Sequence, residues 1–358
     1  MNILCASGLP ENCKVTGKSA EHFNKRLSNL CFAYWTAFAF IKMVFLPVIE
    51  LSNRLKSNVR RFLLTNEKSC VQLVSVLRRT TNNAYAVFEN TGSTLMGIVN
   101  IKQTILFLLP FAEQTHFAEQ TQKQPLFDEF IDDFATFYKS KGFAQPACIN
   151  GPSKGAALFL KAFSKIQFDK PQQINSYHLM YLSESKFTMV LRQCKKSSWY
   201  TQFSKDTKII RCKKKMENAN SSKTYEQLCQ LQIAYEQEEV IPASWTFDEH
   251  LCRLRLANSL QKQYILALEK DHTLISKVGT NAIGYKYVQL GGIYTAVEHR
   301  GNHYAKLLLQ LLCKKLLSAG KTPSLFVKQQ NQAAIQLYKS IGFIKNTDYT
   351  IAYFNQNV

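Results

Sequence analysis

Thirteen residues, Ile293 to Ala305, read Ile-Tyr-Thr-Ala-Val-Glu-His-Arg-Gly-Asn-His-Tyr-Ala and combine features that bind phosphate. The segment predicts a strand, a turn and the start of a helix, because leucines recur at helical spacing from Leu307 to Leu316. The first N–H groups of a helix lack partners within it, and the helix dipole is positive there. The turn is therefore a candidate anion site, where Gly301 lets a phosphate approach the backbone.

The turn Arg300-Gly-Asn-His-Tyr-Ala305 resembles the acetyl-coenzyme A (acetyl-CoA) signature of the GNAT acetyltransferases, Arg/Gln-x-x-Gly-x-Gly/Ala. The resemblance continues through Asn331, Tyr338 and Ile341-Gly-Phe343 in family order and spacing, and covers roughly residues 205 to 358. It implies that acetyl-CoA is the cosubstrate and that its pyrophosphate binds the turn. The departure is His303, which stands where the family's signature has a glycine. Histidine adopts a positive φ less readily than glycine, and its side chain would crowd a phosphate.

The resemblance places cofactor contacts on two further parts of the segment. Backbone groups of Ile293 and Thr295 are expected to pair with the pantetheine as if it were an added strand, and the amide near Thr295 to polarise the thioester carbonyl. Asn331 is expected to contact the pantetheine or to begin a helix. The expected cofactor-binding residues are Ile293, Tyr294, Thr295, Arg300, Gly301, Asn302, His303, Tyr304, Ala305 and Asn331.

Acetyl transfer to an amine needs an acceptor for the amine proton and a donor for the departing thiolate. Free lysine-like amines titrate near about 10.4 and thiols near about 8.5, so both steps benefit from help at neutral pH. Tyr338 follows Asn331 by about two helical turns on the same face. Because the matching family tyrosine lies beside the sulfur, Tyr338 is the candidate general acid. The alternative is an aromatic ring packed in the core.

The base is less evident, because the glutamate common in the family falls at Gln289, whose amide cannot accept a proton at neutral pH. The helix on the acceptor side ends in several carboxylates. Of these, Glu238 and Glu239 are the candidate catalytic bases, acting through water, and Glu298 in the turn is a weaker third. A solvated acidic face explains Glu238 and Glu239 equally well.

Two halves of the chain repeat one order of elements: helix, hairpin, strand, helix, strand. The fold class is therefore α/β with a mixed sheet, and the order resembles a two-domain class of GNAT proteins. We expect tandem GNAT-like folds, of which the first is degenerate and the second complete. The expected domains are an extension at 1–45, a degenerate GNAT-like domain at 46–195 and an acetyltransferase domain at 205–358, with a linker within 183–222.

A competing motif lies in the first half, where Gly151-Pro-Ser-Lys-Gly155 fits the G-x-S-x-G elbow of serine hydrolases. Pro152 restricts the strained geometry that the elbow needs. The surrounding strands also look too few for that fold. In the tandem interpretation this turn is the first repeat's counterpart of the turn at Arg300. Hydrolysis through Ser153 is therefore a remote alternative.

Charge and cysteine content limit the other function classes. With 45 Lys and Arg against 25 Asp and Glu, the net charge of +20 suits polyanions such as coenzyme A, acidic substrates, RNA or an anionic membrane. The basic cluster within 195–215 is interpreted as a solvated face, and contact with nucleic acid or the ribosome has no further support. Ten cysteines without zinc spacing indicate a reduced cytoplasmic protein without metal. Lys42 and Pro47 argue against a membrane span at 30–49, which is instead a packed helix or an extension upstream of Met43.

The leading hypothesis is an N-acetyltransferase that uses acetyl-CoA and an unidentified amine. The alternative is a non-catalytic protein of the same fold that binds coenzyme A or regulates a partner. His303 and Gln289 favour the alternative, whereas Arg300, Gly301 and Tyr338 favour the enzyme. The sequence does not identify the acceptor, because acceptor loops differ most within a fold.

Overall fold

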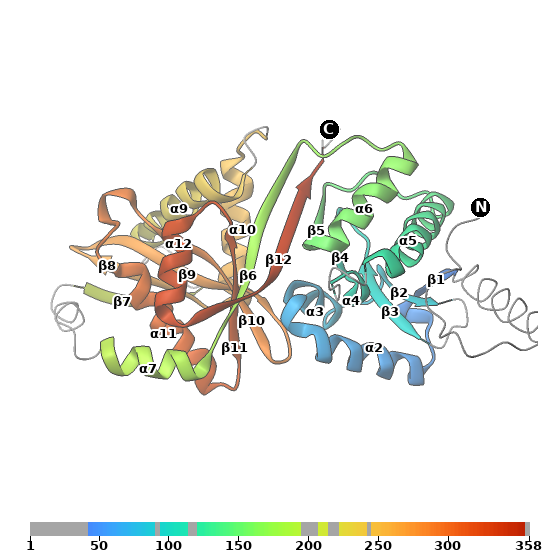
Figure 1. Ribbon diagram of the computed structural model, residues 1–358. Helices are drawn as coiled ribbons and strands as arrows, with labels where there is room; N and C mark the ends of the chain where they lie inside the picture. Colours follow the sequence, from blue (N-terminus) through green and yellow to red (C-terminus); the bar gives the residue numbers. More distant parts are fainter. Residues whose placement is uncertain are drawn as a thin grey trace, which may run out of the picture. The chain divides into compact units, whose positions relative to one another are not determined.

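The computed structural model describes residues 42–358 except 90–93, 114–119, 195–206, 214–221, 242–244 and 355–358 (Figure 1). The expected extension at 1–45 therefore lies almost entirely outside the described residues, as does much of the basic cluster at 195–215. Residues 43–47 form the first strand, so the folded unit begins three residues before the expected boundary. No helix within the described ranges is long and apolar enough to cross a membrane.

The described residues of the first half form five strands and the helices that cover them. The strands are β1 (Met43–Pro47), β2 (Ala84–Glu89), β3 (Leu95–Asn100), β4 (Thr104–Leu108) and β5 (Cys148–Pro152). The helices are α2 (Asn53–Asn66), α3 (Val71–Leu77), α4 (Pro110–Glu113), α5 (Gln120–Ser140) and α6 (Ser153–Ile166), with short 3-10 turns η1 (Val48–Glu50) and η2 (Glu67–Ser69). Apolar side chains fill both faces of this part of the sheet, one beneath α5 and α6 and the other beneath α2 and α3.

The second half carries the remaining strands and a second pair of cores. Its strands are β6 (Gln173–Leu182), β7 (Thr207–Cys212), β8 (Ile265–Lys270), β9 (Thr273–Ile283), β10 (Tyr287–Thr295), β11 (Thr322–Lys328) and β12 (Phe343–Tyr353). Its helices are α7 (Glu184–Cys194), α9 (Ser222–Tyr235), α10 (Glu249–Lys262), α11 (Tyr304–Ser318) and α12 (Gln332–Ile341), with a π-helical turn η6 (Glu236–Val240) and a 3-10 turn η7 (Val297–His299). α7 and β7 lie within 183–222, which the sequence treated as a linker.

The described strands form one mixed sheet in the order β1-β2-β3-β4-β5-β12-β6-β11-β10-β9-β8-β7. Only β4 with β5 and β10 with β11 are parallel. The last strand, β12, pairs with β5 of the first half and with β6, and β6 pairs in turn with β11 (Figure 1). The first half therefore completes its sheet with β12 from the end of the chain, and the second half includes β6, which lies within the expected first domain of 46–195. A fragment beginning after β6 would expose the edges of both β11 and β12.

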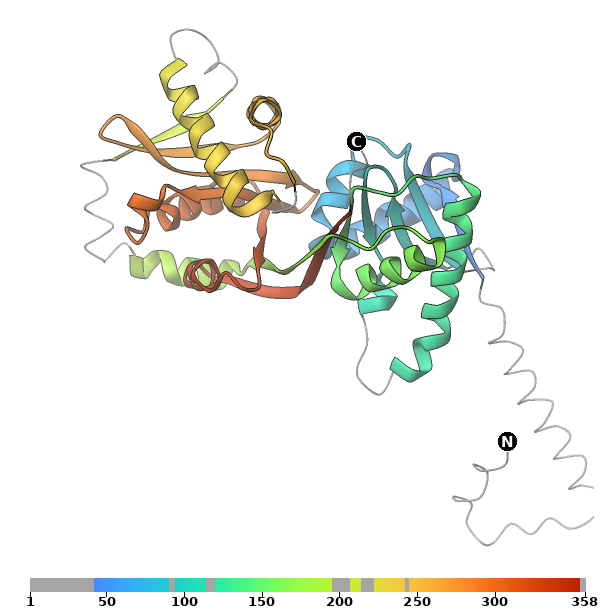
Figure 2. The same ribbon diagram turned by 90° about the horizontal axis from the view of Figure 1, so that it is seen from above.

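The two faces of the second half are covered by different helices, as Figure 2 shows from above. Tyr338 and the leucines of α11 belong to one core, which also contains Phe187 of α7. Leu228 of α9 and Leu256 of α10 belong to the core on the other face. Side chains from α12 and from α9 can therefore meet only where the sheet between them opens.

Candidate active site

The sheet opens between β10 and β11. Their parallel pairing runs from Tyr287 with Thr322 to Leu290 with Leu325 and then stops, although β10 continues to Thr295 and β11 to Lys328. The register of β10 against β9 shifts between Gly291 and Tyr294, and Gly292 has a φ of 60°. A bulge of this kind bends the strand, and it separates β10 from β11 here.

The bulge leaves one edge of β10 open to a ligand. Tyr294 and Ala296 direct their backbone groups toward β9, because the Tyr294 carbonyl accepts from the Ser276 hydroxyl at 3.0 Å and the Ala296 N–H donates to the Ile275 carbonyl at 2.9 Å. Backbone groups alternate along a strand, so those of Ile293 and Thr295 face the gap. An extended chain such as pantetheine can pair with this edge.

The turn that the sequence predicts as an anion site follows directly. After η7, Gly301 has a φ of 81° and His303 a φ of 61°, and α11 begins at Tyr304. His303 is the N-cap residue, yet its side chain makes no capping hydrogen bond. A helix N-terminus without a side-chain cap is a common place for an anion to bind. The positive φ at His303 is the conformation that the family's glycine would adopt.

Arg300 crosses from the turn to the end of α9. Its Nη2 contacts Glu238 Oε2 at 2.7 Å, its Nε donates to the Thr295 carbonyl at 3.0 Å, and its guanidinium lies 5.3 Å from the centre of the Tyr294 ring. The hydrogen bond from Arg300 lowers the pKa of Glu238. While this pair persists, Glu238 is a weak proton acceptor. The pair also brings the negative charge of Glu238 close to the turn at Gly301.

Glu239 points toward the ends of β11 and α12 instead. Its two oxygens contact Lys328 Nζ at 3.1 Å and Asn331 Nδ2 at 3.3 Å. Asn331 begins α12, because its side chain accepts from the Ala334 N–H at 3.0 Å. The third acidic candidate, Glu298, lies in the turn with 72% of its side chain exposed.

Tyr338 lies on α12 beneath the gap, only 6% exposed, with its ring at an angle to Phe343. Burial raises its pKa well above the ordinary value, and Tyr235 and Glu239 raise it further. These two residues belong to α9 and η6, across the sheet from α12. The phenol stays protonated at neutral pH and can donate a hydrogen bond.

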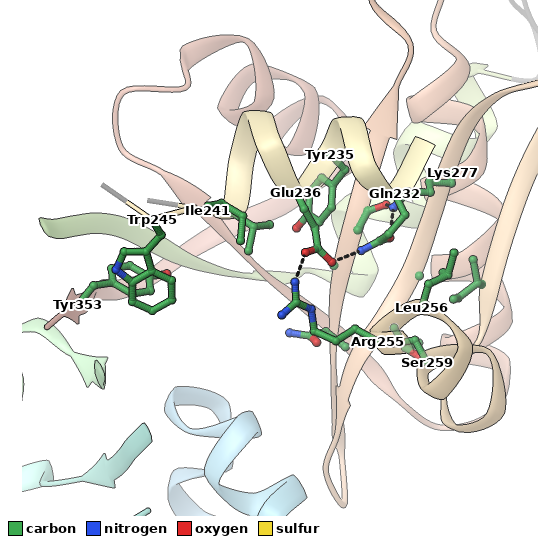
Figure 3. A pocket seen from close by; sticks show the side chains of 17 residues that line it. Gln232, Tyr235, Glu236, Ile241, Trp245, Arg255, Leu256, Ser259, Lys277 and Tyr353 are labelled. Atoms are coloured by element: carbon green, nitrogen blue, oxygen red, sulfur yellow. Dashed lines mark hydrogen bonds and ion pairs between the residues drawn. The ribbon is translucent and has the colours of Figure 1, made fainter. Parts of the chain in front are cut away.

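A cavity of about 380 Å³ opens on the other face, between α9, η6, α10 and the bulge of β10 (Figure 3). Gly291 and Gly292 of the bulge form part of its wall, and Trp245 and Tyr353 form another, with their ring centroids 5.5 Å apart. The cavity therefore adjoins the bulge, and the backbone of Ile293 and Thr295 that faces the gap follows directly along β10.

Three charged side chains that the sequence interpretation did not single out line this cavity. Glu236 is buried and accepts from Arg255 Nη2 at 2.6 Å and from Gln232 Nε2 at 2.9 Å. Lys277 is 3% exposed, and its Nζ donates to the Gly292 carbonyl and to Gln232 Oε1, at 2.9 Å each. The available sequence signal was Lys277 itself, a charged residue inside the buried strand of Leu274 to Val278.

The corresponding turn in the first half is filled by the protein itself. The N–H of Gly155, in the first turn of α6, donates to Glu113 Oε1 at 3.2 Å. A side chain on Gly151 would meet the ring of Phe107 at 2.2 Å. The Glu113 carboxylate therefore occupies the place that a phosphate would take, and the Phe107 ring fills the space through which a phosphate would approach the backbone. Ser153 bonds the Thr350 hydroxyl at 2.8 Å rather than a histidine, so nothing here supports hydrolysis.

No group of three or more metal-binding side chains occurs in the part of the chain that the structure describes. The seven described cysteines are buried, and none of these seven forms a disulfide.

The FR47-like protein family matches residues 272–351, from the β8–β9 turn to the last residues of β12. No curated protein matches the sequence. Among solved structures, a Drosophila protein is 11% identical with a TM-score of 0.51, over 89% of this chain and 100% of that one. A tandem GNAT protein from the clavulanic acid biosynthesis pathway is also 11% identical over the same shares, with a TM-score of 0.46. A GNAT-family acetyltransferase from Novosphingobium aromaticivorans is 14% identical with a TM-score of 0.34, and this chain covers 51% of its own length and 65% of that protein's.

Proposed function

Since this chain is a GNAT-family protein with tandem GNAT-like folds, we propose that it is an acetyl-CoA-dependent N-acetyltransferase whose reaction takes place in the second half. The observation that carries the proposal is the gap between β10 and β11, which ends at a helix without a side-chain cap. The open edge of β10 suits a pantetheine arm and the turn at Gly301 a pyrophosphate. In the first half the equivalent turn is closed by Glu113.

Acetyl-CoA would supply an activated acyl group. The residues around the gap would orient the thioester and donate hydrogen bonds to it. Backbone N–H groups after the bulge would donate to the thioester carbonyl. The Tyr338 hydroxyl would donate to the departing sulfur. Because the pKa of Tyr338 is raised above that of a thiol, it acts by stabilising the thiolate with a hydrogen bond until the amine proton arrives.

The acceptor would occupy the cavity beside the bulge. A volume of about 380 Å³ lies within the usual range of small-molecule sites, roughly 300–1,000 Å³. The Trp245 and Tyr353 rings offer an apolar wall and Glu236 a carboxylate that is already paired with Arg255. We therefore propose a small amine as the acceptor. The test is thiol release from acetyl-CoA by the full chain with amino acids, polyamines and arylalkylamines.

The non-catalytic alternative retains one specific observation. Gln289 is 3% exposed at the position of the family's glutamate, and its amide accepts no proton at neutral pH. Coenzyme A binding without turnover of any amine would favour this alternative. Failure of coenzyme A to bind at all would contradict both functions.

We expect Gly301→Ala to weaken coenzyme A binding at least tenfold, because the φ of 81° disfavours any side chain and the substitution would strain the turn that is proposed to bind the phosphate. Gly320→Ala is the matched control. Gly320 also has a positive φ, 69°, with nothing within 4 Å of an added Cβ, but it follows the far end of α11. Both variants should lose about 1 kcal/mol of stability. Calorimetry should find weaker binding in Gly301→Ala alone, and equal affinities would contradict the assignment of the turn.

We expect His303→Gly to bind coenzyme A as tightly as the wild type or more tightly. Glycine adopts the observed φ of 61° without strain and removes a side chain beside the phosphate turn. The same calorimetric titration measures the change. A marked loss of affinity would show that the imidazole contacts the nucleotide, opposite to the crowding argued here.

A further inference from the structure

The side chain of Lys277 ends at the bulge of β10. Lys277 pairs across the sheet with Tyr294, and its Nζ donates to the carbonyl of Gly292 at 2.9 Å. Its second hydrogen bond, also 2.9 Å, goes to Gln232 Oε1 of α9. The Nζ lies 4.5 Å from the centre of the Tyr235 ring. These bonds use two of the three N–H positions of an ammonium group, and Lys277 lines the cavity with Gln232 and Tyr235 (Figure 3).

The surroundings of Lys277 favour an uncharged amine. Burial lowers the pKa of Lys277 to about 7, against smaller opposing effects of Glu236, Cys212 and Cys252. Burial raises the pKa of both thiols to about 12, so neither carries charge near neutral pH. The remaining carboxylate, Glu236, is held by Arg255 at 2.6 Å. The side chains that face Lys277 from η6, β7 and α10 therefore carry little net negative charge that would stabilise its ammonium form.

The carboxylates at the end of α9 are each engaged with a cation. They are Glu236 with Arg255, Glu238 with Arg300 and Glu239 with Lys328. Glu238 and Glu239 also lie outside the set of residues that line the cavity. Lys277 lines the cavity and the bulge together, and it approaches from the face opposite to Tyr338.

We propose that Lys277 is the base that takes the proton from the acceptor amine, an inference that rests on the acetyltransferase function proposed for the same site. The neutral Lys277 amine accepts one proton from the acceptor ammonium, whose freed electron pair forms the new N–C bond. The C–S bond breaks, and its electron pair leaves on the sulfur, which accepts a hydrogen bond from Tyr338. The second amine proton neutralises the thiolate, and Lys277 returns its proton to water.

The protonation of Lys277 can be measured on the full chain without any substrate. Trace acetic anhydride modifies only neutral amines, and peptide mass spectrometry gives the rate at each lysine as a function of pH. We expect the Lys277 rate to rise with a midpoint near pH 7, well below the value of about 10.4 for a free lysine amine. A midpoint near that of the free amine, or no labelling of Lys277 up to pH 10, would overturn the proposal.

Two substitutions separate catalysis from structural support. Lys277→Arg keeps a donor for Gly292 but cannot release a proton, and Lys277→Gln keeps a smaller neutral donor. We expect kcat/KM to fall at least 10²-fold in both while acetyl-CoA still raises the melting temperature. The rise of the wild-type kcat/KM with pH near 7 should disappear. Lys328→Arg, at the cation that holds Glu239, is the control and should keep that rise.

The outcomes distinguish the two levels of inference. Lys277→Arg with activity within threefold of the wild type would overturn the role of Lys277 and leave the acetyltransferase function standing. If the wild type turns over none of the amines, the acetyltransferase function fails, and the role of Lys277 fails with it. Activity lost in Lys277→Gln but kept in Lys277→Arg would show that a donor to Gly292 suffices and would also overturn the proposal.

Discussion

Tyr338→Phe should lower kcat about 10²-fold while acetyl-CoA binding is unchanged. Phenylalanine keeps the ring that packs in the core with Phe343 and removes only the hydroxyl. A donor that acts on the departing thiolate contributes in the transition state, so its loss appears in kcat and kcat/KM together. A 10²-fold loss corresponds to roughly 2.7 kcal/mol of transition-state stabilisation. Steady-state thiol release and calorimetry measure the two quantities.

The matched control is Tyr349→Phe, which removes a hydroxyl equally shielded from solvent. Tyr349 lies on β12, 3% exposed, where its ring packs 4.2 Å from that of Phe326. Burial raises the pKa of both tyrosines. Unchanged kcat in Tyr338→Phe, with chemistry shown to limit the rate, would assign Tyr338 to the core. Equal losses in both variants would indicate a general effect on folding rather than donation to sulfur.

Local patterns in the sequence were enough to predict the tandem GNAT-like fold and most of the strands. Alternation and turn residues placed β2, β3 and β4 within one residue of their observed ends. The turn before α11 and the motifs from Asn331 to Phe343 carried the resemblance, which the FR47-like match over 272–351 confirms. Each of these signals lies within about thirteen residues of chain, where backbone preferences act without reference to distant partners.

The pairing of β12 with both β5 and β6 was not predictable from local patterns. Tyr349 pairs with Pro152 and with Tyr177, across sequence separations that no local pattern records. α10 was missed because its buried residues form a narrow stripe of Cys252, Leu256 and Leu260, while Leu251 and Leu254 on the same helix are exposed. Because apolar residues occur on both the buried and the exposed faces of α10, its 3.6-residue period is weak in the sequence.

The expected site residues remain proposals, but the structure shows why several were visible in the sequence and others were not. Arg300, Gly301 and His303 lie in one short turn, so their spacing alone places them together. Lys277, Glu236 and Arg255 come from a strand and two helices, and only the folded chain brings them around one cavity. Glu238 and Glu239 are adjacent in sequence, yet the π-helical turn directs them to different cations.

Glu67→Ala should have the largest effect on stability among substitutions far from the proposed chemistry, lowering the free energy of unfolding by about 3–5 kcal/mol. Glu67 is 1% exposed in η2, and its carboxylate accepts from the backbone N–H groups of Lys286 and Tyr287 at 2.9–3.0 Å. Bonds to a charged acceptor contribute about 1.5–3 kcal/mol each, and their loss leaves two part-buried donors without this partner.

These bonds hold the turn between β9 and β10, so Glu67 ties the first half to the strand that carries the bulge. Arg78 of the same half donates to the carbonyl of Ile283 at 2.9 Å, on the other side of that turn. Glu67→Gln retains one accepting oxygen and should lose about half as much stability as Glu67→Ala, whereas the exposed Glu50→Ala should change it by less than about 0.5 kcal/mol. Urea unfolding followed by fluorescence and circular dichroism compares the four proteins. If Glu67→Ala unfolds at the same urea concentration as Glu50→Ala, the backbone donors must find water once the carboxylate is removed, and the link between the halves would be one of packing alone.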